Sequence, residues 1–146
     1  MIRGHTSPIV DVKWSPYKTN ILATASDDAT VKIWDIPQEG LTSDLKTETQ
    51  TLSGHSKKVG LINWHPTVFE LIASGGFDNK VNVWNVITAE SLSSFNLNES
   101  IMSLEWNNVG SLLASTTKDK NVNIMDPRGN KVETVRIIFI KDFQRT

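Results

Sequence analysis

The sequence contains no cysteine among its 146 residues. This absence excludes disulfide bridges, thiolate metal ligands and a cysteine nucleophile, and it fits a reducing compartment. No apolar run approaches the ~18 residues that a membrane-spanning helix needs. The first twenty residues carry charges where a signal peptide would have an apolar segment. We therefore expect a cytoplasmic protein without a membrane span.

An excess of one charge sign is also missing. The chain has 15 basic and 16 acidic residues and a formal net charge of −1. Nucleic-acid-binding domains usually carry a clear basic excess or stripe, so we expect no nucleic-acid partner. The basic clusters are short, Lys57 with Lys58 and Lys118 with Lys120, and such clusters are most often solvated surface.

Helical periodicity is absent, and a long repeat takes its place. Apolar residues do not recur at the i, i+3, i+4 spacing of an amphipathic helix. Instead, Gly4, His5, Trp14, Asp28 and Trp34 return 50 residues later as Gly54, His55, Trp64, Asp78 and Trp84. A third, less complete copy contains Trp106 and Asp119. Self-similarity at such a period is typical of repeat architectures.

Each copy predicts four short strands separated by turn residues. Val10, Val12 and Trp14 alternate with polar residues, as in a half-buried strand. The expected strands are residues 10–14, 21–25, 30–35 and 49–52, then 59–64, 71–74, 81–84 and 90–95, then 101–106, 112–116, 122–125 and 131–135. A polar loop over residues 37–46 lengthens the first copy. Four strands at this period match a WD40-type β-propeller blade.

The expected fold is therefore all-β, with three blades of four-stranded antiparallel sheet in an open partial propeller. The repeats should cover about residues 4–53, 54–96 and 97–135, and residues 136–146 should begin a further, incomplete blade. Three blades cannot close a ring of the usual 4–8. We expect apolar surface on the outer blades and self-association through their open edges. The β-prone window Arg136–Ile140 adds to this tendency.

Four polar residue types recur together in the first two copies. They are His5, Thr24, Asp28 and Trp34 in the first copy and His55, Ser74, Asp78 and Trp84 in the second. An indole N–H only donates, a carboxylate only accepts, and hydroxyl and imidazole can do both. Chained from Trp to Ser/Thr to His to Asp, they can satisfy one another inside a blade. We predict one structural tetrad in each of these two blades.

The third copy keeps only half of this set. Ser115 and Asp119 are present, but Met125 replaces the tryptophan and no histidine precedes the first strand. We expect a partial tetrad there, with the blade held together by apolar packing. The residues expected in that packing are Met102, Leu104, Trp106, Leu113, Val122 and Ile124.

An enzyme is the weakest interpretation of these residues. A hydrolytic triad needs an exposed, activated hydroxyl and an oxyanion hole, whereas these hydroxyls fall in apolar strands and recur with tryptophan. The three histidines match no usual zinc spacing. His65, beside Pro66, is expected to be exposed or locally hydrogen-bonded. We expect no catalytic residue, metal or cofactor.

Beyond the general repeat, the sequence resembles the coronins, a family of actin-associated WD-repeat proteins. The segments that carry the resemblance are residues 4–14, 31–37, 39–41, 54–60, 64–67, 118–122 and 124–128, within a match over about residues 3–140. The most specific are the Ile-Pro-x-Glu-Gly-Leu loop at 36–41, Lys-Lys-Val-Gly at 57–60 and Asp-Pro-Arg at 126–128.

This resemblance implies a protein-binding scaffold on actin filaments, associated with the cytoskeleton. The family implies seven blades, a linker and a C-terminal coiled coil, whereas this sequence has neither the preceding blade nor a heptad pattern. Lys57 and Lys58 are the candidate partner-binding residues, because basic side chains suit an acidic filament surface. The alternatives are a WD-repeat adaptor for a different protein and a truncated remnant without actin binding.

Overall fold

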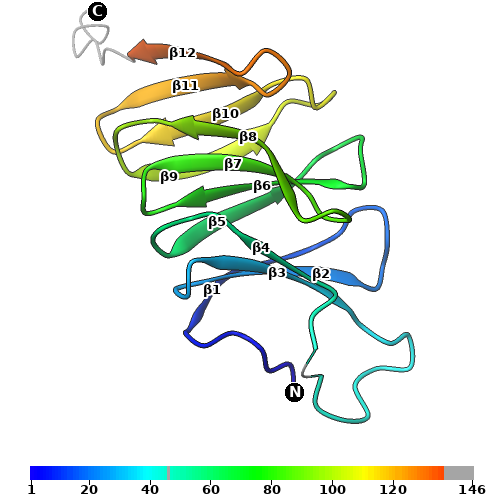
Figure 1. The fold of residues 1–146 in the computed structure, drawn as a ribbon. Coiled ribbons are helices and arrows are strands. Elements are labelled where there is room, and N and C mark those ends of the chain that lie inside the picture. The colour runs from blue at the N-terminus through cyan, green and yellow to red at the C-terminus, as the bar shows by residue number, and fades with distance from the viewer. Residues whose placement is uncertain (46, 137–146) are drawn as a thin grey trace, which may run out of the picture.

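The computed structural model describes residues 1–45 and 47–136, and its regular structure consists of strands. They form three four-stranded antiparallel sheets, each a blade, stacked in chain order (Figure 1). The strands are β1 (Ile9–Trp14), β2 (Ile21–Ser26), β3 (Thr30–Asp35) and β4 (Gln50–Ser53); β5 (Val59–Trp64), β6 (Leu71–Gly76), β7 (Lys80–Asn85) and β8 (Glu90–Asn96); β9 (Ile101–Trp106), β10 (Leu113–Thr117), β11 (Asn121–Asp126) and β12 (Lys131–Arg136). The predicted all-β fold of open blades is confirmed.

Each blade is a meander in which sequential strands pair as neighbours, even across the long loop between β3 and β4. The second and third strands of each blade are joined by the same tight turn. In this turn one residue has a left-handed backbone: Ala29 (φ 69°), Asn79 (φ 63°) and Lys120 (φ 69°). A type I turn followed by a left-handed residue is a common hairpin connection. Glycine or asparagine suits that position, so Ala29 and Lys120 hold it at a steric cost.

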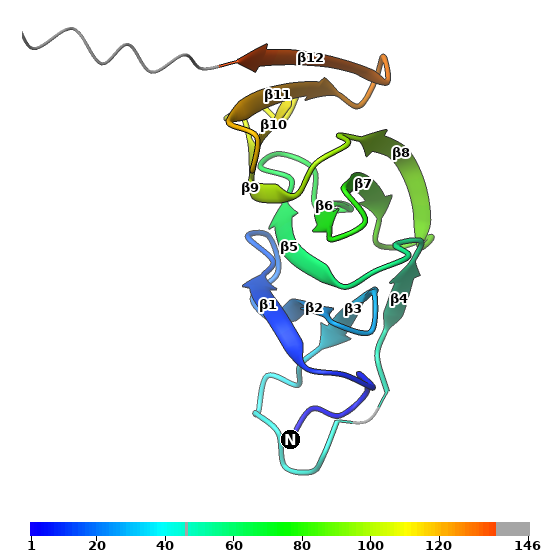
Figure 2. The same ribbon diagram turned by 90° about the vertical axis from the view of Figure 1, so that its left-hand side faces the viewer.

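The blades stack with their first strands on one side of the molecule. Figure 2 shows β1, β5 and β9 in a row, with β4 and β8 on the opposite side. The apolar core lies mainly at the two joints between blades rather than within one sheet. The cluster at the first joint contains Ala23, Ala25, Val31, Ile33, Leu52, Val59, Ile62, Trp64, Ile72, Trp84 and Val86. The cluster at the second joint contains Ala73, Val81, Val83, Phe95, Ile101, Leu104, Trp106, Leu113 and Met125.

Tryptophans in the first strands connect each blade to the one before it. The indole N–H of Trp64 donates to the backbone oxygen of Lys13 over 3.1 Å. Trp106 donates in the same way to the oxygen of Asn63 over 3.3 Å. The Asn63 side-chain amide donates back to Leu104 O over 3.0 Å. Each joint therefore combines buried apolar area with a directed hydrogen bond.

The equivalent tryptophan of the first blade has no blade against it among the described residues. Trp14 is 57% exposed, whereas Trp64 is 6% exposed. Ile9, Val10 and Val12 on the same strand are also exposed. The outer face of the first blade is thus an apolar surface open to solvent. Most of the window Arg136–Ile140 lies outside the described residues.

The expected packing of the third blade needs one correction. Leu104, Trp106 and Leu113 are buried as expected, but Met102 is 62% exposed. A β-bulge between Ile101 and Ser103 breaks the alternation of faces along β9, so Met102 does not share the buried face of Leu104 and Trp106. Met125 is fully buried, whereas Val122 and Ile124 are only partly buried. The core of this blade is therefore built around the methionine that replaces tryptophan.

Candidate functional site

The structure brings the four polar residues of the first blade into one chain of hydrogen bonds. Trp34 Nε1 donates to Thr24 Oγ1 over 2.9 Å. The Thr24 hydroxyl lies 2.7 Å from His5 Nε2, and His5 Nδ1 lies 2.7 Å from Asp28 Oδ2. With the Nδ1 proton donated to the carboxylate, Nε2 accepts from the hydroxyl, so every donor in the chain has an acceptor. The chain connects the entry loop, β2 and β3.

The second blade contains the same arrangement. Trp84 Nε1 donates to Ser74 Oγ over 2.8 Å, and Ser74 Oγ lies 2.7 Å from His55 Nε2. His55 Nδ1 lies 3.0 Å from Asp78 Oδ1. The side chains of His55 and Asp78 are 1% and 4% exposed. A hydroxyl already engaged by an indole and an imidazole, in a closed site, is poorly placed to act as a nucleophile.

Glycine precedes the histidine in both tetrads because the tryptophan ring lies against it. A Cβ at Gly4 would be 2.5 Å from Trp34 Cη2, and one at Gly54 would be 2.7 Å from Trp84 Cη2. Real Cβ atoms do not approach a ring carbon this closely, so the Gly-His dipeptide and the distant tryptophan form one packing unit.

The third blade leaves its serine unpaired. Ser115 Oγ is buried and has no hydrogen-bond partner among the described residues. Asp119 instead accepts from the Thr117 hydroxyl over 2.5 Å and from the Asn121 amide over 2.6 Å. The two residues expected to form a partial tetrad are therefore not connected to each other.

The tetrad carboxylates are held in their charged form. Burial alone would raise the pKa of Asp28, but hydrogen bonds from Thr30, His5 and the Thr6 amide outweigh it and lower the pKa to about 2. Burial likewise opposes a lowered pKa at Asp78, where the Ser56 amide and His55 supply the stabilising hydrogen bonds. An ionised carboxylate orients the histidine, which fits a structural network.

Lys57 and Lys58 lie in the loop that enters the second blade. Lys58 Nζ lies 4.3 Å from the centre of the Phe77 ring. Phe77 is 50% exposed, and its amide donates to Lys58 O over 2.8 Å. Lys57 is exposed beside them. The sequence pattern did not indicate the aromatic partner, because Phe77 occupies the turn position that Asp27 holds in the first blade.

His65 is locally hydrogen-bonded, one of the two expected outcomes, and is also buried in the joint between the second and third blades. Its Nδ1 accepts from the amides of Thr67 (3.1 Å) and Val68 (3.0 Å), and its Nε2 donates to Gly110 O over 2.9 Å. The ring packs on Trp106 with 4.6 Å between centroids. Burial lowers the pKa of His65, the bond to Gly110 opposes this change, and the charge of Arg128 adds to it.

Comparison with known proteins agrees with this geometry. The family model described as "WD domain, G-beta repeat" matches residues 1–35, 46–85 and 89–126. The chain belongs to the WD-repeat family. The matched segments of this WD-repeat chain contain both tetrads and the incomplete third set.

The relatives are coronins, which confirms the resemblance seen in the sequence. The WD-repeat chain is 46% identical to Coronin-2B of Xenopus tropicalis and 45% identical to Coronin-2B of Xenopus laevis, in each case over 97% of this chain and 32% of the relative. It also superimposes on the crystal structure of the WD40 domain of Toxoplasma gondii coronin. There the TM-score is 0.89 and the identity is 46%, over 92% of this chain and 35% of that one. The chain thus spans about a third of these relatives' length.

Two further findings concern residues 1–45 and 47–136. No group of three or more His, Cys, Asp or Glu side chains in this part of the chain is arranged to hold a metal ion. The same part contains no helix long and apolar enough to cross a membrane.

Proposed function

We propose that this chain is part of a protein-binding scaffold of coronin type that associates with actin filaments in the cytoplasm. The observation that carries the proposal is the exposed cation–aromatic pair of Lys58 and Phe77, with Lys57 beside it. Exposed aromatic side chains provide contact area at an interface, and basic residues steer a protein toward an acidic partner. The relatives named coronin, at 46% identity, support the choice of partner.

Further lysines at the same end of the blades extend this basic surface. Lys118 and Lys120 are exposed in the β10–β11 turn, the third-blade counterpart of the β6–β7 turn that holds Phe77 (Figure 1). The Asp78 carboxylate is occupied inside the second blade by His55, whereas the exposed Asp119 lies between Lys118 and Lys120 and offsets part of their charge.

Co-sedimentation with filamentous actin tests the proposal. We expect actin-dependent pelleting that weakens about ten-fold in a Lys57→Glu, Lys58→Glu variant, since reversing two exposed charges changes steering and rim contacts. A Lys13→Glu, Lys131→Glu variant changes net charge equally at exposed sites elsewhere and should pellet like the parent. A spin without actin measures self-pelleting.

A Phe77→Ala variant separates the aromatic contact from charge. It should fold normally, because the ring is half exposed, and should also weaken pelleting. Absence of actin-dependent pelleting by the parent chain would refute actin binding. Equal loss in the double-glutamate variant and its charge control would refute the assigned surface and leave only general electrostatic attraction.

We also infer that the open face of β1 promotes self-association with another copy of the chain. That face presents Val10, Val12 and Trp14. In the second copy of the repeat, Val12 and Trp14 correspond to Ile62 and Trp64, the β5 residues that pack on the first blade at the existing joint. Static light scattering should show species larger than one chain, and a Val12→Lys variant should shift them toward the monomer. A soluble monomer at all concentrations tested would contradict this inference.

A further inference from the structure

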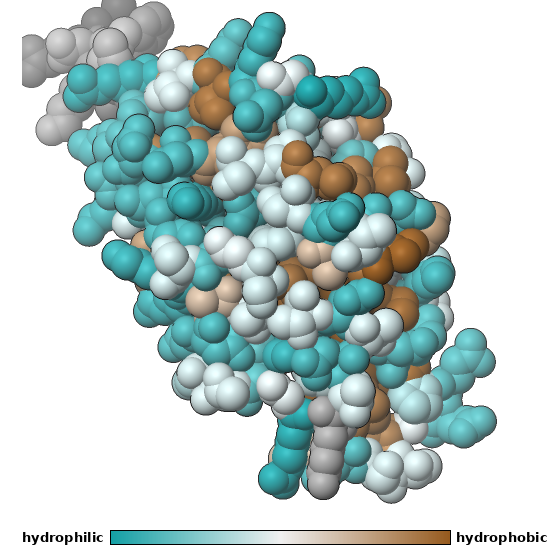
Figure 3. Space-filling view, viewed as in Figure 1, coloured by the Kyte–Doolittle hydropathy of each residue, from teal (hydrophilic) through white to brown (hydrophobic). Residues whose placement is uncertain are grey.

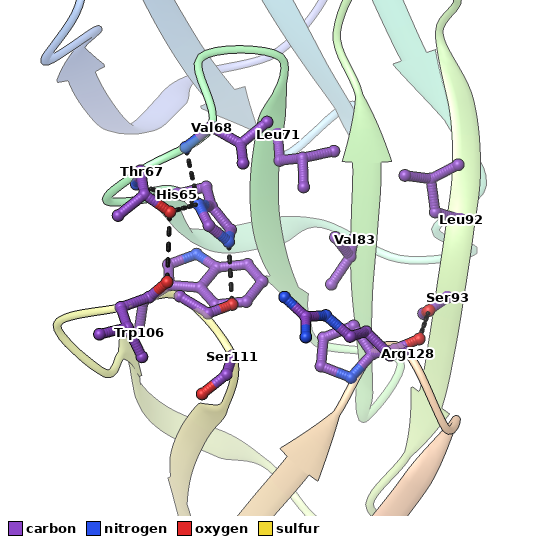
Figure 4. Close-up of a pocket in the computed structure, with 13 residues that line it drawn as sticks. His65, Thr67, Val68, Leu71, Val83, Leu92, Ser93, Trp106, Ser111 and Arg128 are labelled. Atoms are coloured by element: carbon purple, nitrogen blue, oxygen red, sulfur yellow. Dashed lines mark hydrogen bonds between the residues drawn. The ribbon is translucent and has the colours of Figure 1, made fainter.

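The joint between the second and third blades contains a cavity of about 240 Å³ at the end of the blades opposite Lys57 (Figure 4). It is bounded by the β5–β6 loop, the β9–β10 loop, strand β8 and the β11–β12 turn. Its apolar walls are Leu71, Val83, Leu92 and Trp106. Ligand pockets for cofactor-sized molecules usually measure about 300–1,000 Å³. This cavity instead matches a single large side chain.

Most polar groups around the cavity are already hydrogen-bonded within the protein. Ser93 Oγ donates to Pro127 O over 2.8 Å, and Thr67 Oγ1 donates to Val109 O over 3.2 Å. His65 uses both ring nitrogens within the joint. These bonds hold the walls together and leave few polar atoms free to recognise a ligand.

Arg128 is the exception. Its guanidinium projects into the cavity in Figure 4, and no carboxylate of the described residues lies within 4.0 Å of it. The nearby Asp126 carboxylate accepts instead, at Oδ1, from the backbone amides of Arg128 (2.9 Å) and Gly129 (3.4 Å). A guanidinium matches a carboxylate in shape and charge, so the unused group in this cavity favours an anionic partner.

The first joint has a cavity of about 260 Å³ in the corresponding place but with different chemistry. Ile87 takes the position of Arg128, since its amide donates to Asn85 Oδ1 over 2.8 Å just as Arg128 donates to Asp126. Lys18 in that cavity already lies 5.4 Å from the centre of the Phe69 ring. An apolar cavity with an unpaired guanidinium is therefore found at the second joint and not at the first.

We propose that the cavity of the second joint is a docking pocket for a short peptide segment of a protein partner. The segment places one large apolar side chain between Leu92 and Trp106, and an adjacent carboxylate pairs with Arg128. The rim supports this occupant, because Val68, Leu92 and Val109 are exposed apolar residues. Figure 3 shows apolar side chains gathered toward the side where the β1–β2, β5–β6 and β9–β10 loops lie in Figure 1.

Nuclear magnetic resonance of the ¹⁵N-labelled chain tests the pocket with three defined peptides. Acetyl-Gly-Phe-Asp-Gly-amide supplies both recognition groups. Replacing Asp by Asn in the peptide removes only the charge, and replacing Phe by Ala removes only the ring. We expect the first peptide to shift the Trp106 indole resonance saturably and the other two to bind at least ten-fold more weakly.

Two variants of the chain complete the test. Arg128→Glu should lose binding of the Phe-Asp peptide. Arg136→Glu, an equal charge change at an exposed position at the other end of the blade, should keep it. Equal binding of the Asp and Asn peptides, or full binding by Arg128→Glu, would overturn the proposal, as would absence of binding by the parent. Because Lys57 and Lys58 lie at the opposite end of the blades, this result is independent of actin co-sedimentation.

Discussion

Replacing the tetrad serine by alanine should destabilise the protein, whereas replacing its third-blade counterpart should not. Ser74 and Ser115 occupy equivalent positions on β6 and β10, and both are buried. Ser74 connects Trp84 and His55 through bonds of 2.8 and 2.7 Å, whereas Ser115 Oγ has no partner among the described residues. The same substitution therefore removes a hydrogen-bonded hydroxyl in the second blade and an unpaired hydroxyl in the third.

The magnitudes follow from hydrogen-bond energetics. Each lost bond costs a net of about 1 kcal/mol, and each buried polar group left unpaired costs about 1–3 kcal/mol. Ser74→Ala loses two bonds and leaves the Trp84 indole N–H without a partner, while His55 Nε2 keeps only the Asn82 side-chain amide at 3.3 Å. We expect it to lower the free energy of unfolding by about 3 kcal/mol, roughly a hundredfold in the equilibrium constant. Ser115→Ala should be neutral or stabilising by up to about 1 kcal/mol.

Urea unfolding followed by tryptophan fluorescence measures both effects. The urea midpoint should fall in Ser74→Ala and stay the same or rise in Ser115→Ala. The slope of the unfolding free energy against urea concentration should be unchanged in both variants. Blades of a repeat protein can unfold separately, so circular dichroism is recorded as a second probe. We expect its transition to coincide with that of tryptophan fluorescence, as two-state unfolding requires. Equal destabilisation by the two substitutions would show that the hydrogen-bond network contributes nothing beyond packing, and the reasoning would fail.

Three further perturbations address single features. Ala29→Gly should raise the unfolding free energy by about 1 kcal/mol, measured by thermal denaturation, because alanine is strained at φ 69°; Asn79→Gly should change it less, and equal changes would contradict the steric explanation. Gly54→Ala should cost about 1–3 kcal/mol by forcing the buried Trp84 ring to move, and an unchanged urea midpoint would refute this. Stability should fall as pH drops below 6.5, the ordinary pKa of a histidine, because burial lowers the pKa of His65 in the folded protein and the unfolded chain then binds more protons. The urea midpoints at pH 7.5 and 5.5 should lie closer together in His65→Gln than in the parent. An undiminished difference would show that His65 is not the cause of the pH dependence.

The sequence predicted most of what lies inside a blade. Strand positions follow from alternation and turn residues, and the structure brings His5, Thr24 and Trp34 together as their donor and acceptor types required. These contacts are predictable because the same residue types recur at the same spacing.

Contacts between blades were less accessible from the sequence. The roles of His65 and Arg128 depend on how neighbouring blades stack, and neither residue recurs in the other copies. Met102 was misassigned because a β-bulge beside Ile101, which the sequence does not reveal, breaks the alternation that would place it with Leu104 and Trp106. Repetition therefore makes the inside of each unit predictable and leaves the joints, where the candidate pocket lies, to the structure.

The indole bonds at the joints give the column of blades a direction. Trp64 always points back toward the preceding blade, and Trp106 does the same, so the two ends of the column expose different surfaces. Association in which β1 of one copy packs on the third blade of the next, as β5 packs on the first blade, is therefore heterologous. Such contacts do not form twofold dimers; they generate closed rings where the rotation allows and open filaments where it does not.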